Sequence, residues 1–192
     1  MKLREIIVMA SISVVFGVLY LVWIFFGQFI EGLFGPIVSG LIRGMWVMAP
    51  IVCAYIIRKP GAAFISELIA AGSEVLFGSV SAGTVMLLGF TQGIGVELAF
   101  AVTRYRSYRL PVLMLAGMLG MAGNFLPLYY ITGYGEMSAS ILLYMFGTML
   151  ISGAVMAGWG SKAIADALNR TGVLHNFAIS KEQHGKDAVR HG

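Results

Sequence analysis

The sequence predicts an all-α integral membrane protein with six transmembrane helices. Of its 192 residues, 58% are hydrophobic and only 11% are charged, and the mean hydropathy is +0.85. A soluble domain carries about 25% charged residues, so this chain would expose far too much apolar surface to water. The hydrocarbon interior of a bilayer suits such a composition, and the 12% of aromatic residues argues against a disordered chain.

Six apolar stretches support this fold class, because about 20 residues of helix cross roughly 30 Å of hydrocarbon. The stretches are Ile6–Phe26, Ile37–Ile57, Gly61–Val80, Thr84–Thr103, Leu110–Thr132 and Met137–Trp159. None of them shows the sustained alternation of a transmembrane β-strand. We therefore expect residues 1–160 to form one membrane-embedded domain with short connections.

Basic residues predict the orientation of these helices. Twelve of the 13 Lys and Arg residues lie before the first stretch, after the sixth, or in the connections that follow the second and the fourth. The other three connections contain no basic residue. Because Lys and Arg accumulate on the cytoplasmic side of membrane proteins, we expect both termini in the cytoplasm. The net charge of +4 then reflects topology and attraction to anionic lipid, not binding to nucleic acid.

The chain that follows the sixth stretch is less apolar. Residues 161–172 predict a short amphipathic helix at the membrane interface, with Ile164, Ala165 and Leu168 on one face and Gly172 as its cap. Residues 173–192 contain all three histidines and predict a flexible cytoplasmic tail.

The inventory of reactive residues argues against an enzyme. Cys53 is the only cysteine and no histidine lies within the apolar stretches, so neither a disulfide framework nor a zinc site of His and Cys is available. The phosphate-binding motif G-x-x-x-x-G-K-[ST] does not occur in the sequence either. We expect a non-enzymatic protein without a metal site or a cofactor.

Four ionisable residues lie inside the predicted spans, namely Arg43, Glu67, Glu74 and Glu97. A charge at the centre of a bilayer costs roughly 2.5–3.5 kcal/mol on insertion scales, so each needs a partner or a water-lined cavity. If all four are ionised, one Arg against three Glu leaves a charge of −2. Either protons or a cationic ligand must compensate for this charge, and both indicate function.

The rise of about 1.5 Å per residue gives the depth of each polar side chain along its helix. Six of them fall in one layer, about 9 to 13 Å below the outer boundary, and these are Arg43, Trp46, Glu74, Gln92, Asn124 and Tyr144. Spans two to six thus each contribute to this layer, which predicts a ligand site open to the outside. Glu67 and Glu97 lie about 9 Å above the inner boundary, and Glu67 is two turns from Glu74 on one helix face.

Purely structural roles are alternatives for these side chains. Arg43 could neutralise Glu74 or extend to the outer surface, and Trp46 could belong to an interfacial aromatic belt. The side-chain amides of Gln92 and Asn124 could simply hold helices together. Glu97 could be a protonated packing residue, whereas Glu74 is the hardest to explain without a ligand.

Short motifs in the third and fourth spans resemble those of a known transporter family. Ser66–Glu67–Leu68 and Gly72–Ser73–Glu74 are followed by Gln92–Gly93–Ile94–Gly95–Val96–Glu97. With six helices and cytoplasmic termini, the chain resembles the substrate-binding S components of energy-coupling factor (ECF) vitamin transporters, and among these the YkoE family. The resemblance implies an S-component-like bundle in the plasma membrane of a bacterium or archaeon, which binds thiamine or its hydroxymethylpyrimidine precursor.

The same resemblance implies partner proteins. The S component captures the vitamin outside, while a separate transmembrane T subunit and two cassette ATPases drive its release inside. In this family, small residues on the first helix contact the partner, often alanines four apart. Here Ala10 is followed by Val14, so Ala10, Ser13 and Gly17 are the expected docking residues.

Thiamine matches the predicted layer chemically. Its permanently positive thiazolium suits an anionic site and the face of an aromatic side chain, here Trp46 or Tyr144. Its aminopyrimidine presents a donor beside an acceptor, which a glutamate and the amide of Gln92 or Asn124 can pair with.

Two other functions remain open from the residues alone. In the first, the chain is a proton-coupled transporter of a small cation, and the three intramembrane glutamates relay protons. In the second, it is a structural or assembly protein whose buried charges only pair its helices.

Overall fold

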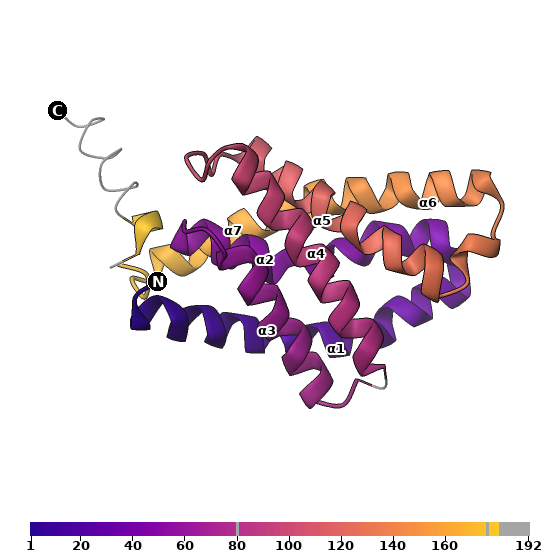
Figure 1. Ribbon diagram of the computed structural model, residues 1–192, viewed down its shortest axis with the longest axis horizontal. Coiled ribbons are helices and arrows are strands. Elements are labelled where there is room, and N and C mark those ends of the chain that lie inside the picture. Colours follow the sequence, from indigo (N-terminus) through magenta and orange to yellow (C-terminus); the bar gives the residue numbers. More distant parts are fainter. Residues whose placement is uncertain (80, 176, 181–192) are drawn as a thin grey trace.

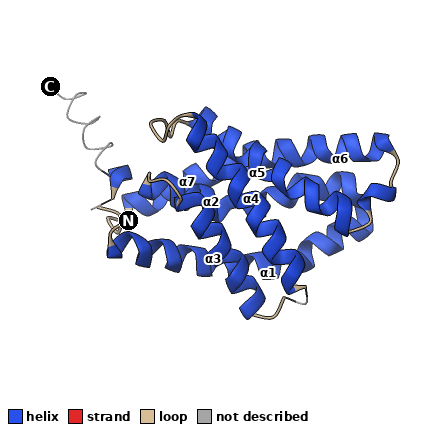
Figure 2. Ribbon diagram, viewed as in Figure 1, coloured by secondary structure: helices blue, strands red, loops and turns tan. Residues whose placement is uncertain are grey.

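The computed structural model describes residues 1–79, 81–175 and 177–180. Within these residues the chain forms helices joined by short turns, and no strand is present (Figure 2). The long elements are α1 (Leu3–Ser39), η1 (Gly40–Val47), α2 (Met48–Ile57), α3 (Ala62–Leu76), α4 (Ala82–Val102), α5 (Leu110–Ile131), α6 (Ala139–Ser152), the π-helix η3 (Gly153–Trp159) and α7 (Gly160–Arg170). A single 3₁₀ turn, η2 (Tyr134–Glu136), joins α5 to α6.

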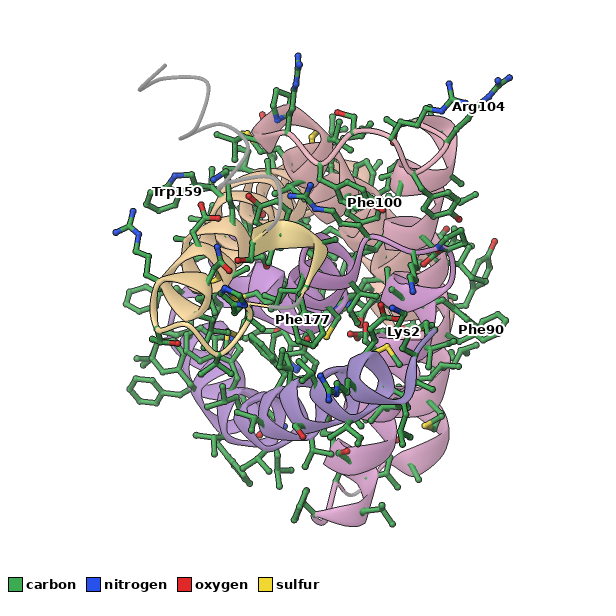
Figure 3. The ribbon with its side chains drawn as sticks, turned by 90° about the vertical axis from the view of Figure 1, so that its left-hand side faces the viewer. Lys2, Phe90, Phe100, Arg104, Trp159 and Phe177 are labelled. Carbon is green, nitrogen blue, oxygen red and sulfur yellow. The ribbon has the colours of Figure 1, made fainter. Side chains whose placement is uncertain are left out.

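The helices form one elongated bundle (Figure 1). Helices α1 and α6 run along its length, whereas α3 and α4 cross it diagonally. The N-terminus and α7 lie at the same end, which we call the terminal end, and η2 lies at the opposite, far end. Seen from the terminal end, Arg104 and Trp159 project away from the bundle on different sides (Figure 3).

The prediction of an all-helical membrane protein is confirmed. Four helical runs in the described part of the chain are long and apolar enough to cross a membrane, and they are Leu3–Ile57, Ala82–Val102, Leu110–Ile131 and Ala139–Arg170. Helices α1 to α6 correspond to the six predicted spans. Helix α3 is shorter than the predicted Gly61–Val80, since it has 15 residues and covers only about 22 Å.

The connection expected between the first two spans, over residues 27–36, is wrong. Helix α1 continues to Ser39, and its one break is at Gly35, with φ 77° and ψ 176°. Bilayer thickness suggested an earlier end, but no proline precedes Pro36, and α1 continues through Gly27 and Gly32. Glycine adopts a positive φ at little cost and proline lacks the N–H donor. Glu31 therefore lies in a helix rather than in a loop.

Glycine permits the close approach of α5 and η3. A Cβ atom on Gly117 would overlap the backbone of Gly153, and a Cβ atom on Gly153 would overlap that of Gly117. Glycine pairs of this kind let helix backbones touch in membrane proteins. This contact places α5, one of the helices around the cavity described below, directly against the run of α6 and η3.

The terminal end is closed by polar contacts and by the chain after α6. Asp166 accepts a hydrogen bond from Tyr55 at 3.1 Å and forms an ion pair with Lys162. The predicted helix over 161–172 is α7, which continues from η3 without a break. Leu174 and Ile179 are buried, so the expected flexible tail does not apply to them, and residues 181–192 of that tail lie outside the described residues.

Candidate functional site

A cavity of about 120 Å³ lies among α1, η1, α3, α4 and α5. Its lining residues are Tyr20, Ile24, Arg43, Trp46, Glu67, Ala71, Glu74, Val85, Leu88, Gly89, Gln92 and Asn124. Six of the eight side chains predicted for the ligand site are among them, namely Arg43, Trp46, Glu67, Glu74, Gln92 and Asn124. The structure therefore brings together most of the predicted layer.

Helical spacing explains which residues of α3 and α4 face the cavity. On α3 they are Glu67, Ala71 and Glu74, at positions i, i+4 and i+7 of one helix face. On α4 the same spacing selects Val85, Leu88, Gly89 and Gln92. Ala71 and Gly89 let α3 and α4 approach closely, because a Cβ atom on Gly89 would lie 2.6 Å from the Ala71 Cβ atom.

Two buried oxygen atoms of the cavity lack a protein donor. Glu67 is 1% exposed and Asn124 is 4% exposed. Within the described residues, Glu67 Oε2 and Asn124 Oδ1 accept no hydrogen bond. Because an unsatisfied buried polar atom costs about 1–3 kcal/mol, this cavity is suited to a molecule that brings N–H or O–H donors to both oxygens.

Tyr20 is a cavity residue that the sequence reasoning missed. Its hydroxyl accepts a hydrogen bond from the Ala49 N–H at 3.0 Å, and its side chain lines the cavity together with Glu67. The depth calculation would have found it, since Tyr20 is six residues before the end of the first predicted span, or about 9 Å from its outer boundary. The first span was left without a member in the layer, although it contributes this tyrosine.

Arg43 forms its ion pair with Glu31 and not with Glu74. Its guanidinium donates to Glu31 Oε2 at 2.8 Å and to the Tyr134 hydroxyl at 2.8 Å. Tyr134 also donates to Glu31, and burial raises the pKa of Tyr134 to about 12, so its hydroxyl keeps its proton. The suggestion that Arg43 neutralises Glu74 is therefore wrong. Neither carboxylate of the cavity has an ion-pair partner among the described residues.

Trp46 lies between this cavity and a second one. The second cavity, of about 180 Å³, is lined by Ile24, Gly27, Gln28, Glu31, Ser39, Ile42, Arg43 and Trp46. Three of these residues, Ile24, Arg43 and Trp46, line both cavities. The Trp46 ring packs on Gly27, where a Cβ atom would lie 3.1 Å from it. This position, inside the bundle, differs from that of an interfacial belt.

Comparison with known proteins identifies the family. The family model described as the permease component of an ABC-type cobalt transport system matches residues 4–123. A Bacillus subtilis (strain 168) protein described as an HMP/thiamine permease, YkoE, is 46% identical over 181 residues, which cover 94% of this chain and 91% of the relative. A solved S component of an ECF transporter superposes with a TM-score of 0.95 at 44% identity, covering 100% of this chain and 98% of that one.

The chain belongs to the S components of ECF transporters. It is therefore a substrate-binding subunit of a membrane transporter and not an enzyme. Among the described residues of this S component, no group of three or more His, Cys, Asp or Glu side chains could hold a metal ion.

Two of the predicted site residues lie outside the cavity of the S component. Glu97 accepts hydrogen bonds from three N–H groups at the start of α3, those of Gly61 at 2.6 Å, Ala63 at 3.1 Å and Phe64 at 3.1 Å, and from the Tyr105 hydroxyl at 2.8 Å. It thus caps this helix, because the first N–H groups of a helix lack partners within it and favour a negative charge.

Tyr144 is the second residue outside the cavity. Its side chain is 64% exposed on α6, whereas the neighbouring Met145 and Met149 are fully buried and face the bundle. Depth along a helix fixed the level of Tyr144 but not its direction around the helix axis. The layer of polar side chains therefore has no contribution from α6.

Two of the three expected docking residues of α1, Ser13 and Gly17, face inward. Ser13 is fully buried, with its hydroxyl 3.9 Å from Cys53 Sγ of α2. Gly17 packs on α3 so closely that a Cβ atom would lie 2.6 Å from the Ala70 carbonyl oxygen. Ala10 is partly exposed. Ser13 and Gly17 thus hold the S component together and are not available on its surface in this conformation.

Proposed function

We propose that this S component captures thiamine or hydroxymethylpyrimidine outside the cell and delivers it for ATP-driven uptake with a T subunit and two cassette ATPases. The relative from Bacillus subtilis, described as an HMP/thiamine permease, supports the substrate class. The positive-inside rule supports termini in the cytoplasm of a bacterial or archaeal cell. The far end of the bundle then faces the outside.

The observation that carries this proposal is the pair of buried carboxylates that have no ion-pair partner in the described part of the chain. Glu67 and Glu74 are 1% and 4% exposed and line one cavity, while the nearby Arg43 is engaged by Glu31 at 2.8 Å. A ligand that carries a positive charge, or donors for both carboxyl groups, compensates for their burial. The thiazolium of thiamine supplies the charge, and the aminopyrimidine ring shared with hydroxymethylpyrimidine supplies N–H donors.

The remaining lining residues fit a heteroaromatic ring. Trp46 offers an aromatic face for stacking or for a cation–π contact. Gln92 can donate and accept, and Asn124 Oδ1 is without a donor in the described protein. These groups match a ring whose edge alternates donors and acceptors.

An organic ligand suits this donor set better than a transition-metal ion. The family model that matches residues 4–123 is described by cobalt transport. The cavity, however, presents two carboxylates and two side-chain amides without histidine or cysteine, whereas cobalt and its neighbours favour imidazole and thiolate ligands. Cobalt binding to the purified protein serves as a negative control in the test below.

We predict that Glu74→Gln weakens thiamine binding at least tenfold while the protein stays folded. The substitution removes the charge but keeps the size of a side chain that lines the cavity, and losing one charged contact is worth about 1.5–3 kcal/mol. Isothermal titration calorimetry with thiamine and with hydroxymethylpyrimidine measures the change in Kd. Tyr144→Phe, on the exposed face of α6, is the control and should bind normally. Unchanged affinity in Glu74→Gln, or no binding of either compound to the wild type, would overturn the proposal.

The geometry does not favour the proton-coupled alternative. Its relay requires Glu97 beside the other two glutamates, but the Glu97 carboxylate is held by four donors at the start of α3. Proteoliposomes that contain this chain alone distinguish the two functions. Uptake of thiamine driven by a pH gradient, without ATPases, would support the alternative and contradict the ECF mechanism.

A further inference from the structure

The second cavity forms a chamber that adjoins the ligand cavity at the level of Arg43 and Trp46. We call it the outer chamber. Beyond the residues that it shares with the ligand cavity, its wall is formed by Gly27, Gln28 and Glu31 of α1, by Ser39, and by Ile42 of η1. The two cavities are thus consecutive compartments, of about 180 Å³ and 120 Å³, with the Arg43 side chain in the wall between them.

The Arg43 side chain is held in that wall by residues of two elements, α1 and η2. Glu31 of α1 accepts its charged hydrogen bond at 2.8 Å, and Tyr134 of η2 accepts a second at 2.8 Å. Ser39 donates to the same Glu31 oxygen at 3.1 Å, and Tyr134 donates to the other one. Together, Glu31, Ser39, Arg43 and Tyr134 form what we call the Arg43 cluster.

The hydrogen bonds of Arg43 leave one of its N–H donors unused. The Arg43 side chain is 14% exposed and that of Glu31 is 31% exposed. Arg43 Nε has no hydrogen-bond partner among the described residues. This unused N–H can pair with an acceptor other than Glu31 and Tyr134.

The backbone beneath Arg43 is fixed, which leaves the side chain as the part that moves. The Ser152 hydroxyl donates to the Leu41 carbonyl at 2.6 Å and accepts from the Gly44 N–H at 2.8 Å. The indole of Trp23 donates to the Ile42 carbonyl at 3.0 Å. These bonds attach η1 on both sides of Arg43, so an opening between the two cavities is a change of Arg43 rotamer and not a displacement of η1.

We propose that the outer chamber is the access route to the ligand cavity, and that Glu31 and Tyr134 control passage by holding Arg43 across it. This inference rests on the function proposed above. An arriving organic cation meets Glu31 first and can replace the guanidinium at its carboxylate. The released Arg43 side chain then turns out of the wall, and the ligand passes beside Trp46 to the pair of buried glutamates. Arg43 returns to Glu31 once the ligand has left the chamber.

Control of passage has a kinetic signature that a ligand contact lacks. Weakening a barrier between two compartments raises the rates of entry and exit by the same factor, so the Kd changes little. Losing a contact to the bound ligand instead raises the dissociation rate and leaves association nearly unchanged. Glu31 and Tyr134 do not line the ligand cavity, so the first pattern is expected for both.

Stopped-flow fluorescence with thiamine as the probe tests this inference on the full chain in detergent. Trp46, in the cavity wall, reports arrival of the ligand, and calorimetry on the same samples gives Kd. In Tyr134→Phe, which loses the bonds to both Arg43 and Glu31, we expect association and dissociation both to accelerate by at least roughly tenfold, the usual effect of losing a hydrogen bond to a charged group, with Kd within twofold of the wild type. Glu31→Gln, which loses the ion pair, should also accelerate both rates, association less than dissociation because the arriving cation no longer meets a carboxylate.

Tyr105→Phe is a matched control. It removes the same kind of bond, from a tyrosine hydroxyl to a glutamate at 2.8 Å, but at Glu97, away from both chambers. Its binding rates should equal those of the wild type. Thermal melting of each variant verifies that it is folded.

Two results would overturn the inference while leaving the proposed function intact. One is unchanged rates in both Tyr134→Phe and Glu31→Gln. The other is a weaker Kd that comes from dissociation alone, which would make these residues part of the binding site. If wild-type protein binds neither thiamine nor hydroxymethylpyrimidine, the proposed function fails, and this inference fails with it.

Discussion

Glu67 and Glu74 lie two turns apart on α3, and the cavity provides no ion-pair partner for either among the described residues. The charge count of the sequence anticipated this imbalance, but it included Arg43 as a possible partner. The structure shows that Arg43 does not neutralise these two carboxylates, because its guanidinium forms an ion pair with Glu31. The charge of the two carboxylates must then be compensated by protons or, as we propose, by the ligand.

Depth along a helix is predictable from sequence, whereas direction around the helix axis is not. Glu67 and Glu97 have the same predicted depth, yet Glu67 enters the cavity and Glu97 turns to the first N–H groups of α3. The N–H groups that Glu97 binds belong to the start of another helix, α3. The sequence of α4 alone therefore does not predict this contact. The same limit explains why Tyr144 matched the layer but faces outward.

At the residue scale, we predict that Glu97→Gln lowers stability without weakening binding. An amide oxygen cannot replace both carboxylate oxygens, which together accept four hydrogen bonds, and it lacks the charge that favours a helix N-terminus. The loss should be about 1–3 kcal/mol, visible as a lower melting temperature in detergent. Thiamine affinity should stay within twofold, and a tenfold loss of affinity would place Glu97 in the site after all.

At the scale of elements, the sequence predicted the number and order of the helices but not how each one ends. Bilayer thickness suggested a break after Phe26, yet α1 continues through Gly27 and Gly32, and no proline precedes Pro36. The extra turns of α1 bring Glu31 within 2.8 Å of Arg43. The outer chamber exists because of this extension, and length rules alone gave no sign of it.

Contact between α5 and η3 leads to a prediction for glycine. Gly117→Ala should destabilise the fold by about 1–3 kcal/mol, the usual effect of overpacking, because the new Cβ atom overlaps the backbone of Gly153. Gly147→Ala on α6 is the matched control, since a Cβ atom there meets nothing within 4 Å, and alanine favours a helix by about 1 kcal/mol. Melting temperatures should fall for the first variant and hold or rise for the second. Equal melting temperatures would contradict the packing argument.

At the scale of the whole molecule, composition and charge placement predicted a helical membrane bundle, and the comparisons confirm the S-component fold with a TM-score of 0.95. Ser13 and Gly17 show the limit of inferring a partner-docking surface from a pattern of small residues. A small-residue pair at helical spacing suits either a partner or a neighbouring helix of the same chain. Here α2 and α3 occupy it, which sequence spacing cannot distinguish.

Orientation in the membrane yields the last prediction. If the termini are in the cytoplasm, Glu136→Cys in η2, at the far end, should react with a membrane-impermeant maleimide in intact cells. Arg170→Cys in α7 should react only after lysis. Both positions are exposed, and the native Cys53 is buried, so it should not interfere. Labelling in the opposite order would reverse the topology, and the outer chamber would then face the cytoplasm.

The short helix α3 has a consequence for the lipid around the protein. Its 15 residues cover about 22 Å, against roughly 30 Å of hydrocarbon, and at its end Leu76 and Phe77 are 87% and 55% exposed. A hydrophobic segment shorter than the membrane makes the adjacent bilayer thin. We therefore expect a smaller hydrophobic thickness where Leu76 and Phe77 meet lipid. Lipid chain length should then affect directly the helix that carries both cavity glutamates.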